Sequence, residues 1–388
     1  MSGDYLTNRI ETVAGLAPVV VLVLLMVGSA GADIVHHSLV QTVSPSVRAN
    51  GMAEAGVALV DRYAVYHNPA ALGFFHRERR AAFNIYPLRA ALIPELDEDV
   101  RLSHVSLSLG SPSAVRIGKC SFSAGIGYHR SKLTVPDLAF WWTATPEDLH
   151  SVVDNFSLGV ASTGAVEVAV GVTYKRLTAE HTPFDAMYDP SRREVQREHG
   201  HAFDYGLLLR REFRLSERAV EGVKRRVYLT VTAGASWSNY GPDWNWLYVD
   251  EADRQPRIRR QGAAVQVDRR VRDRELYHLL VSYEYEELLP SSSSYHKVGL
   301  ELAVYETVAA RVGRFDDGHH PYHTYGFSVS SRELTRRLRG SEGDSKGEGY
   351  WGWIFEHVTV EYSLARTEDD DELGSARRTF HGLSVVVY

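Results

Sequence analysis

Cysteine is almost absent from this sequence, because Cys120 is the only one among 388 residues. One cysteine forms no internal disulfide, so the chain is not one of the small proteins that disulfides hold together. An excess of one charge is also missing, since 43 Lys and Arg face 49 Asp and Glu for a net charge of -6. This balance argues against a nucleic-acid partner, and the 44% of hydrophobic residues argue against disorder.

Long hydrophobic runs are missing as well, with one exception near the start of the chain. The exception extends from Val13 to Val27 and is followed by Ala30, Gly31 and Ala32, a cleavage site of small residues. We expect residues 1–32 to be a cleaved signal peptide that exports the chain. An uncleaved membrane anchor is the alternative, although the run is shorter than the about 18 to 20 residues that a spanning helix needs.

Catalytic motifs of familiar types are absent, including G-x-S-x-G, H-E-x-x-H and the phosphate-binding loop. Histidine and aspartate do gather in the stretch DDGHHPYHT, residues 316–324. No second cluster of metal ligands accompanies it, and its Gly318 and Pro321 are ordinary turn residues. We therefore expect no metal, no cofactor and no enzymatic activity.

What the sequence does contain is persistent alternation between apolar and small or polar residues. A typical stretch places apolar side chains at every second position, namely Val166, Val168, Val170, Val172 and Tyr174. About fourteen such stretches follow one another from residue 81 to the end, each roughly nine to twelve residues long. A tilted strand needs about 9 to 11 residues to cross a bilayer, whereas strands of soluble proteins average about 5 to 6.

The opposite faces of these expected strands carry mainly Gly, Ala, Ser and Thr, with a few charges. The charged positions are Glu167, Lys175, Glu284, Lys297, Glu301 and Glu361. A closed barrel explains both faces, because apolar residues contact lipid while small and polar ones face a filled lumen. The sequence therefore predicts an all-β fold, a transmembrane antiparallel barrel of about fourteen strands. A soluble exported β protein is the alternative.

The connections between the expected strands differ in length and composition. Two long connections hold tryptophan pairs, Trp141 with Trp142 and Trp244 with Trp246. Exposed aromatic residues mark binding sites, so these loops are candidates for capturing a ligand, with a packed lid over the barrel as the alternative. Residues 214–226 and 331–349 are expected to be basic, mobile connections on the side of the two termini.

Small residues dominate the segment before the first strand, which reads RANGMAEAGVALVDRYAVYHNPAALGFF over residues 48–75. Such a segment fits where other backbone is close. The lumen of a barrel of about fourteen strands is wide enough to need a filling, and Pro69 supplies a stiff bend before the wall begins. We expect residues 33–79 to form a plug in the lumen and residues 80–388 to form the barrel.

The same segment resembles the N-terminal motif of the FadL long-chain fatty-acid transporters and the PorV/PorQ outer-membrane proteins. The matching residues are Arg48, Gly51, Ala55, Ala58, Asp61, Ala64, Asn68, Pro69 and Ala70. Two positions depart from the motif, where Glu54 and Ala71 replace glycines. The resemblance implies a fourteen-stranded barrel in the bacterial outer membrane, with the segment inside it as a hatch. FadL relatives pass apolar molecules inward, and PorV relatives serve a secretion system.

We therefore expect a passive uptake channel for small hydrophobic molecules, with outer-membrane lipids around it. The candidate path for the ligand follows Met52, Leu72, Phe74 and Phe75, and simple core packing is the alternative for each. The inward charges predict ion pairs between the wall and the plug, which argues against a wide apolar tunnel. The alternative function is a secretion-associated or scaffolding barrel with a closed lumen, whose partners are secretion-system proteins.

Overall fold

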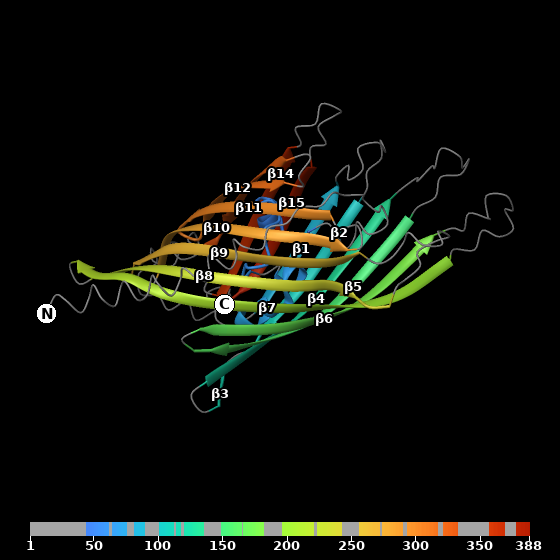
Figure 1. The fold of residues 1–388 in the computed structure, drawn as a ribbon. Coiled ribbons are helices and arrows are strands. Elements are labelled where there is room, and N and C mark those ends of the chain that lie inside the picture. Colours follow the sequence, from blue (N-terminus) through green and yellow to red (C-terminus); the bar gives the residue numbers. More distant parts are fainter. Residues whose placement is uncertain are drawn as a thin grey trace, which may run out of the picture.

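The strands of the computed structural model form one closed antiparallel barrel (Figure 1). The structure describes residues 44–61, 64–75, 81–89, 101–111, 114–117, 120–135, 149–164, 166–181, 196–220, 223–242, 256–271, 274–289, 293–316, 321–332, 357–368 and 378–388. The tryptophans of the two long connections, residues 1–43 and residues 333–356 lie outside this part of the chain.

Fourteen strands make the wall, and a short fifteenth one, β3 (Val115–Ile117), pairs only with the beginning of β4. Pairing of β1 with β15 and of β2 with β4 closes the ring, so the predicted barrel is confirmed. The wall strands are β1 (Ala81–Arg89), β2 (Arg101–Gly110), β4 (Cys120–Val135), β5 (Leu149–Thr163), β6 (Glu167–His181), β7 (Gln196–Val220), β8 (Val223–Tyr240), β9 (Arg257–Val271), β10 (Arg274–Leu289), β11 (Ser293–Val304), β12 (Val308–Asp316), β13 (Tyr322–Ser330), β14 (Val358–Glu368) and β15 (Arg378–Val387).

Alternation in the sequence becomes alternation of exposure in the wall. In β11 the apolar Val298, Leu300 and Leu302 are exposed, while their neighbours on the opposite face are buried. An apolar face that is exposed in this way is the face that a membrane barrel turns to lipid. No helix in the described part of the chain is long and apolar enough to span a membrane.

Two expectations about the strands are wrong. Strands β4 to β10 have 15 to 25 residues rather than nine to twelve. Residues 214–226 were expected to be a mobile connection, but β7 continues to Val220 and β8 begins at Val223. Cross-strand pairs such as Glu217 with Arg226 and Arg218 with Arg225 extend the hairpin. The many charged residues of this stretch hide the alternation of apolar and polar residues in the sequence.

The two ends of the barrel differ in their connections. The start of β1 and the end of β15 lie at the same end of the barrel, because Ala81 pairs with Val387. We call this end the short-turn end. Its brief connections are residues 164–166, 221–222, 272–273 and 305–307, and it also holds one long connection, residues 331–357. The opposite end, the long-loop end, holds the connections 136–148, 182–195 and 243–255.

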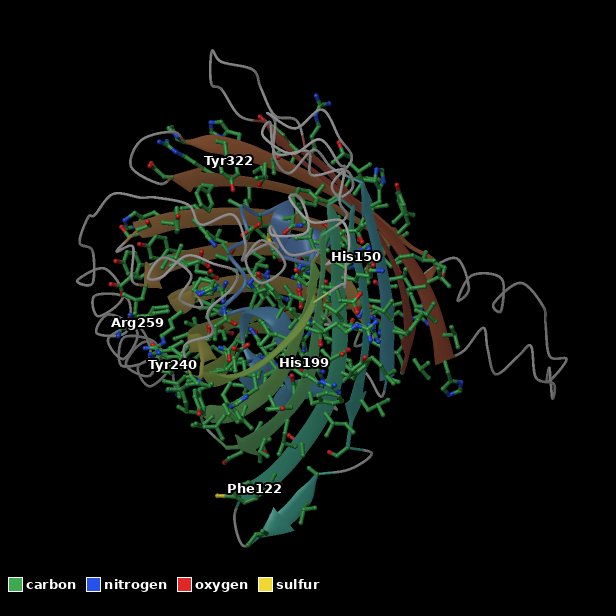
Figure 2. The ribbon with its side chains drawn as sticks, turned by 90° about the vertical axis from the view of Figure 1, so that its right-hand side faces the viewer. Phe122, His150, His199, Tyr240, Arg259 and Tyr322 are labelled. Atoms are coloured by element: carbon green, nitrogen blue, oxygen red, sulfur yellow. The ribbon has the colours of Figure 1, made fainter. Side chains whose placement is uncertain are left out.

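Residues 44–61 and 64–75 lie inside the ring of strands, and we call them the inner segment (Figure 2). It contains two short helices, α4 (Val47–Asn50) and α5 (Ala64–His67), and a 3-10 helix, η2 (Pro69–Phe74). Ser46 caps α4 by accepting a hydrogen bond from the Ala49 backbone, and Asn68 caps η2 by accepting one from Ala70. Proline at the first position of η2 suits a helix start, since the missing N–H would have no partner there.

Candidate functional site in the barrel interior

A belt of glycines runs across the inner face of the wall where the inner segment contacts it. Its members come from nine strands and are Gly125, Gly159, Gly171, Gly206, Gly234, Gly262, Gly299, Gly313 and Gly326. In the register of the sheet, Gly171 stands between Gly159 and Gly206. The sequence showed small inner faces but not this belt, because only strand pairing reveals that the glycines are neighbours.

Each belt glycine leaves space for a specific part of the inner segment. A Cβ at Gly171 would overlap the backbone of Pro69, and a Cβ at Gly234 would overlap the carbonyl of Val57. A Cβ at Gly51 would lie 2.9 Å from the Cα of Gly326, so glycine meets glycine there. The inner segment therefore rests on the wall at backbone-to-backbone distance, which only glycine permits.

Asn68, a residue of the resemblance motif, connects the two halves of the inner segment to the wall. Its amide nitrogen donates to the carbonyls of Val57 at 3.0 Å, Leu207 at 3.0 Å and Ala235 at 3.3 Å. Its amide oxygen accepts from the Ala70 N–H at 3.1 Å. Because it is fully buried, loss of this side chain leaves several buried polar groups without a partner.

Glu301 on β11 is the ionic anchor of the first half of the inner segment. Arg48 binds it with two nitrogens, Nη2 at 2.6 Å and Nε at 3.0 Å. The wall supplies Arg311 Nε at 2.5 Å and His278 Nε2 at 2.9 Å on the same carboxylate. Arg48 also lies 3.7 Å from Asp61, so two residues of the resemblance motif meet here.

Glu284 on β10 is a second anchor. One of its oxygens accepts the backbone N–H groups of Gly56 at 2.8 Å and Val57 at 2.7 Å. Lys297 lies 3.7 Å from Glu284 and 3.6 Å from Glu54 of the inner segment. Glu54, which stands where the resemblance motif has glycine, therefore has an ionic partner. These contacts are ion pairs and charge-assisted hydrogen bonds between the wall and the inner segment, in a buried setting.

Other inward charges pair within the wall. Lys175 lies 2.8 Å from Asp204, and Arg260 lies 2.6 Å from Glu286. The sequence singled out Lys175, whereas Arg260, His278 and Arg311 were missed because their strands alternate less regularly. Their positions opposite inward acids become visible only with the register.

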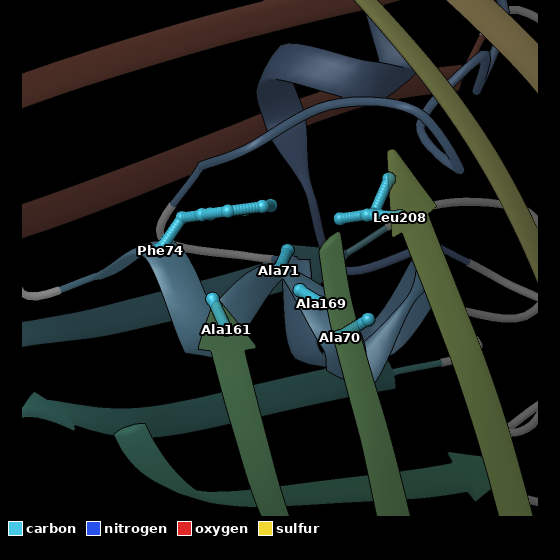
Figure 3. Close-up of a cluster of buried hydrophobic side chains, with 6 residues drawn as sticks. All are labelled: Ala70, Ala71, Phe74, Ala161, Ala169 and Leu208. Carbon is cyan, nitrogen blue, oxygen red and sulfur yellow. The ribbon is translucent and has the colours of Figure 1, made fainter. Parts of the chain in front are cut away.

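The second half of the inner segment, here residues 69–75, is held without ion pairs. Ala70, Ala71 and Phe74 of η2 pack against Ala161 on β5, Ala169 on β6 and Leu208 on β7 (Figure 3). The Ser123 hydroxyl donates to the Gly73 carbonyl at 2.6 Å. Residues 69–75 contain no ionisable side chain, so apolar packing and neutral hydrogen bonds hold them, together with the Arg210 guanidinium, which lies 6.0 Å from the centre of the Phe74 ring.

The four apolar ligand candidates of the inner segment are all buried, but they do not meet in one place. Met52 packs with Val57, Ala58, Leu59, Ala264 and Leu280. Phe74 belongs to the alanine cluster, and Phe75 packs with Ala82 and Val386 near the first and last strands. Leu72 lies over Gly125 and Gly159. None of the four lines the cavities described next.

A polar cavity of about 430 Å³ opens at the short-turn end. It is lined by charged side chains, among them Arg48, Asp61, Glu275, His278, Glu301 and Arg311. A smaller space of about 40 Å³ lies beside Ala58 and Leu59. Within the described residues, no group of three or more His, Cys, Asp or Glu is arranged to hold a metal ion.

Comparisons with known proteins give structural neighbours only. No family model matches the chain, and no curated protein matches its sequence. Similar solved structures include the CymD monoaromatic hydrocarbon channel, with 10% identity, a TM-score of 0.44 and coverage of 89% of this chain and 97% of that one. The Ralstonia pickettii toluene transporter TbuX has 10% identity, a TM-score of 0.42 and coverage of 90% and 98%. A Pseudomonas aeruginosa FadL homologue has 11% identity, a TM-score of 0.39 and coverage of 88% and 98%.

The class of protein follows from the chain's own architecture. A closed antiparallel ring with an exposed apolar outer face and a polar, filled interior is the architecture of bacterial outer-membrane barrels.

Proposed function

We propose that this chain is an outer-membrane channel of FadL type that admits small hydrophobic molecules and is closed at rest by the inner segment. In this proposal residues 1–32 are a cleaved signal peptide, residues 33–79 the plug and residues 80–388 the barrel. The short-turn end faces the periplasm. The tryptophans at 141, 142, 244 and 246 collect ligand at the long-loop end.

The observation that carries the proposal is the unequal attachment of the two halves of the inner segment. The first half is fixed by Arg48 on Glu301 and by two N–H groups on Glu284. Breaking a buried ion pair costs about 3–5 kcal/mol, because an uncompensated charge stays behind. The second half has no such anchor, so it is the half that moves.

The wall under the second half suits an apolar passage. Gly125, Gly159, Ala161, Ala169, Gly171 and Gly206 line it. These side chains carry no charge and little bulk, and Leu208 beside them is apolar, so displacement of η2 opens a narrow, mainly apolar channel with Arg210 at its edge. Leu72, Phe74 and Phe75 then move with the gate and contact the ligand.

Uptake of an apolar dye by intact cells tests the proposal. Cells are preferred to phospholipid vesicles because lipopolysaccharide slows passage of the dye through the outer membrane, whereas a simple phospholipid bilayer lets the dye pass without a channel. We expect cells that carry the wild-type protein to take up N-phenylnaphthylamine faster than cells with an empty vector. Asn68→Ala removes the hydrogen bonds that secure η2, so uptake should rise by about tenfold, the factor for about 1.4 kcal/mol.

Asn155→Ala is the matched control. Asn155 is also buried and donates to a backbone carbonyl, that of His129, but this bond lies within the wall. Its uptake should equal the wild-type value. Equal uptake by wild type, Asn68→Ala and the empty vector overturns the channel proposal.

A secretion-associated or scaffolding barrel with a closed lumen is the second candidate. It is favoured by the polar lining of the 430 Å³ cavity and by the separation of the apolar candidates into different clusters. This candidate predicts no dye uptake by either variant, together with co-purification of a large exported or periplasmic protein.

A further inference from the structure

The hairpin of β7 and β8 extends past its neighbour β6 at the short-turn end. Glu167, the first residue of β6, pairs with Arg210, whereas β7 continues to Val220. Figure 1 shows this hairpin reaching beyond the adjacent green strands. Strands β9 and β10 support it from the other side, up to the pair Val271 and Arg274.

Five arginines share the outer face of this region, and we call them the arginine patch. Register and exposure place them on the face of the exposed Leu209, Val265 and Leu279. The patch consists of Arg211, Arg218, Arg225, Arg269 and Arg274. Four are exposed and Arg269 is half-buried.

No acidic residue of the described chain shares this outer face on β7 to β10 at the short-turn end. The nearby acids turn to the inner face and are paired there, with Arg270 on Glu212 at 3.0 Å and Arg214 on Glu217 at 2.6 Å. Within the patch, Arg218 stands directly opposite Arg225. Like charges at directly opposite positions destabilise a sheet, so an anion bound beside this pair stabilises the hairpin.

On the outer face of the long-loop end, acids stand among the cations. There, cations face acids: Arg130 lies 3.8 Å from Asp154, Arg197 lies 2.8 Å from Glu180, and Arg259 lies 3.3 Å from Glu287. The arginine patch differs from these sites because no described acid stands among its cations.

The surroundings of the patch identify the anion as part of a lipid. Arg269 stands opposite Tyr277, and the guanidinium of Arg211 lies 4.6 Å from the centre of the Phe213 ring. Aromatic residues and arginines at the edge of an apolar wall mark the headgroup level of a bilayer. The planar guanidinium binds phosphate oxygens with two nitrogens at once. We propose that the arginine patch binds anionic phospholipid headgroups in the leaflet at the short-turn end.

Native mass spectrometry of the detergent-solubilised full-length protein tests this proposal with phosphatidylglycerol and phosphatidylcholine as probes. We expect the wild type to bind phosphatidylglycerol at least tenfold more tightly, with the preference falling as salt is raised. The variant Arg218→Gln/Arg225→Gln/Arg274→Gln should lose most of it. A control with the same loss of charge at the other end, Arg130→Gln/Lys132→Gln/Arg176→Gln, should keep it.

Folding of all three proteins is checked by the shift in gel mobility on heating. Equal affinity of the wild type for the two lipids overturns the proposal, and so does an equal loss in both variants. Polyglutamate is the probe for an acidic protein partner. Binding of this peptide that depends on the patch, without a lipid preference, also overturns the proposal. Lipid binding is measured without dye uptake, so this proposal and the channel proposal are tested independently of each other.

Discussion

At the scale of single residues, position relative to the wall decides what a charge does. Glu301 and Glu287 are both glutamates on strands and both pair with arginine. Glu301 is buried inside the barrel and binds two arginines and a histidine, whereas Glu287 lies on the partly exposed outer face. The sequence identified Glu301 as an inward charge, but its partners Arg311 and His278 required the register of three strands.

The pair allows a matched comparison. Glu301→Gln removes the negative charge under Arg48 and Arg311, so we expect the free energy of unfolding to fall by about 3–5 kcal/mol. Glu287→Gln breaks a surface pair and should change it by less than about 1 kcal/mol. Urea unfolding in detergent measures both. Equal losses in the two variants would show that Glu301 is not a buried anchor.

At the scale of elements, the glycine belt explains how a segment of the chain fits inside the wall. Alternation predicted which face of each strand is small, and this expectation holds. The belt itself was not visible in the sequence, because the register between neighbouring strands decides which glycines stand side by side. The sequence does not show that register. The extension of the β7–β8 hairpin through residues 214–226 was missed because the bulge between Arg214 and Ser216 and the dense charges interrupt the alternation.

Adding volume to the belt should separate the inner segment from the wall. Gly171→Val places a side chain against Pro69 and Ala70, while valine itself suits a strand. We expect a loss of about 1–3 kcal/mol or release of the segment. Gly164→Val is the control, because the nearest atom to a Cβ there is Val166 O at 3.6 Å. Limited proteolysis of residues 44–75 reports release. Similar resistance of the two variants would argue against close contact at the belt.

At the scale of the whole molecule, the sequence predicted the architecture because lipid and lumen impose opposite demands on alternate residues. It predicted an interior segment through a motif of small residues and through the Asn-Pro-Ala step. The sequence did not reveal that ion pairs hold one half of the segment, while packing and neutral hydrogen bonds hold the other. That asymmetry arises from contacts with residues of the wall more than a hundred positions away, such as Glu284 and Glu301.

Amide hydrogen exchange of the folded protein in detergent tests the central claim of a segment inside the barrel that is fixed at one half and movable at the other. The account predicts that amides of residues 47–59 exchange slowly and that amides of residues 70–75 exchange measurably faster, while both remain slower than an unstructured peptide. Exchange of residues 47–59 at the rate of residues 70–75 or faster would contradict it, as would unprotected exchange of the entire inner segment.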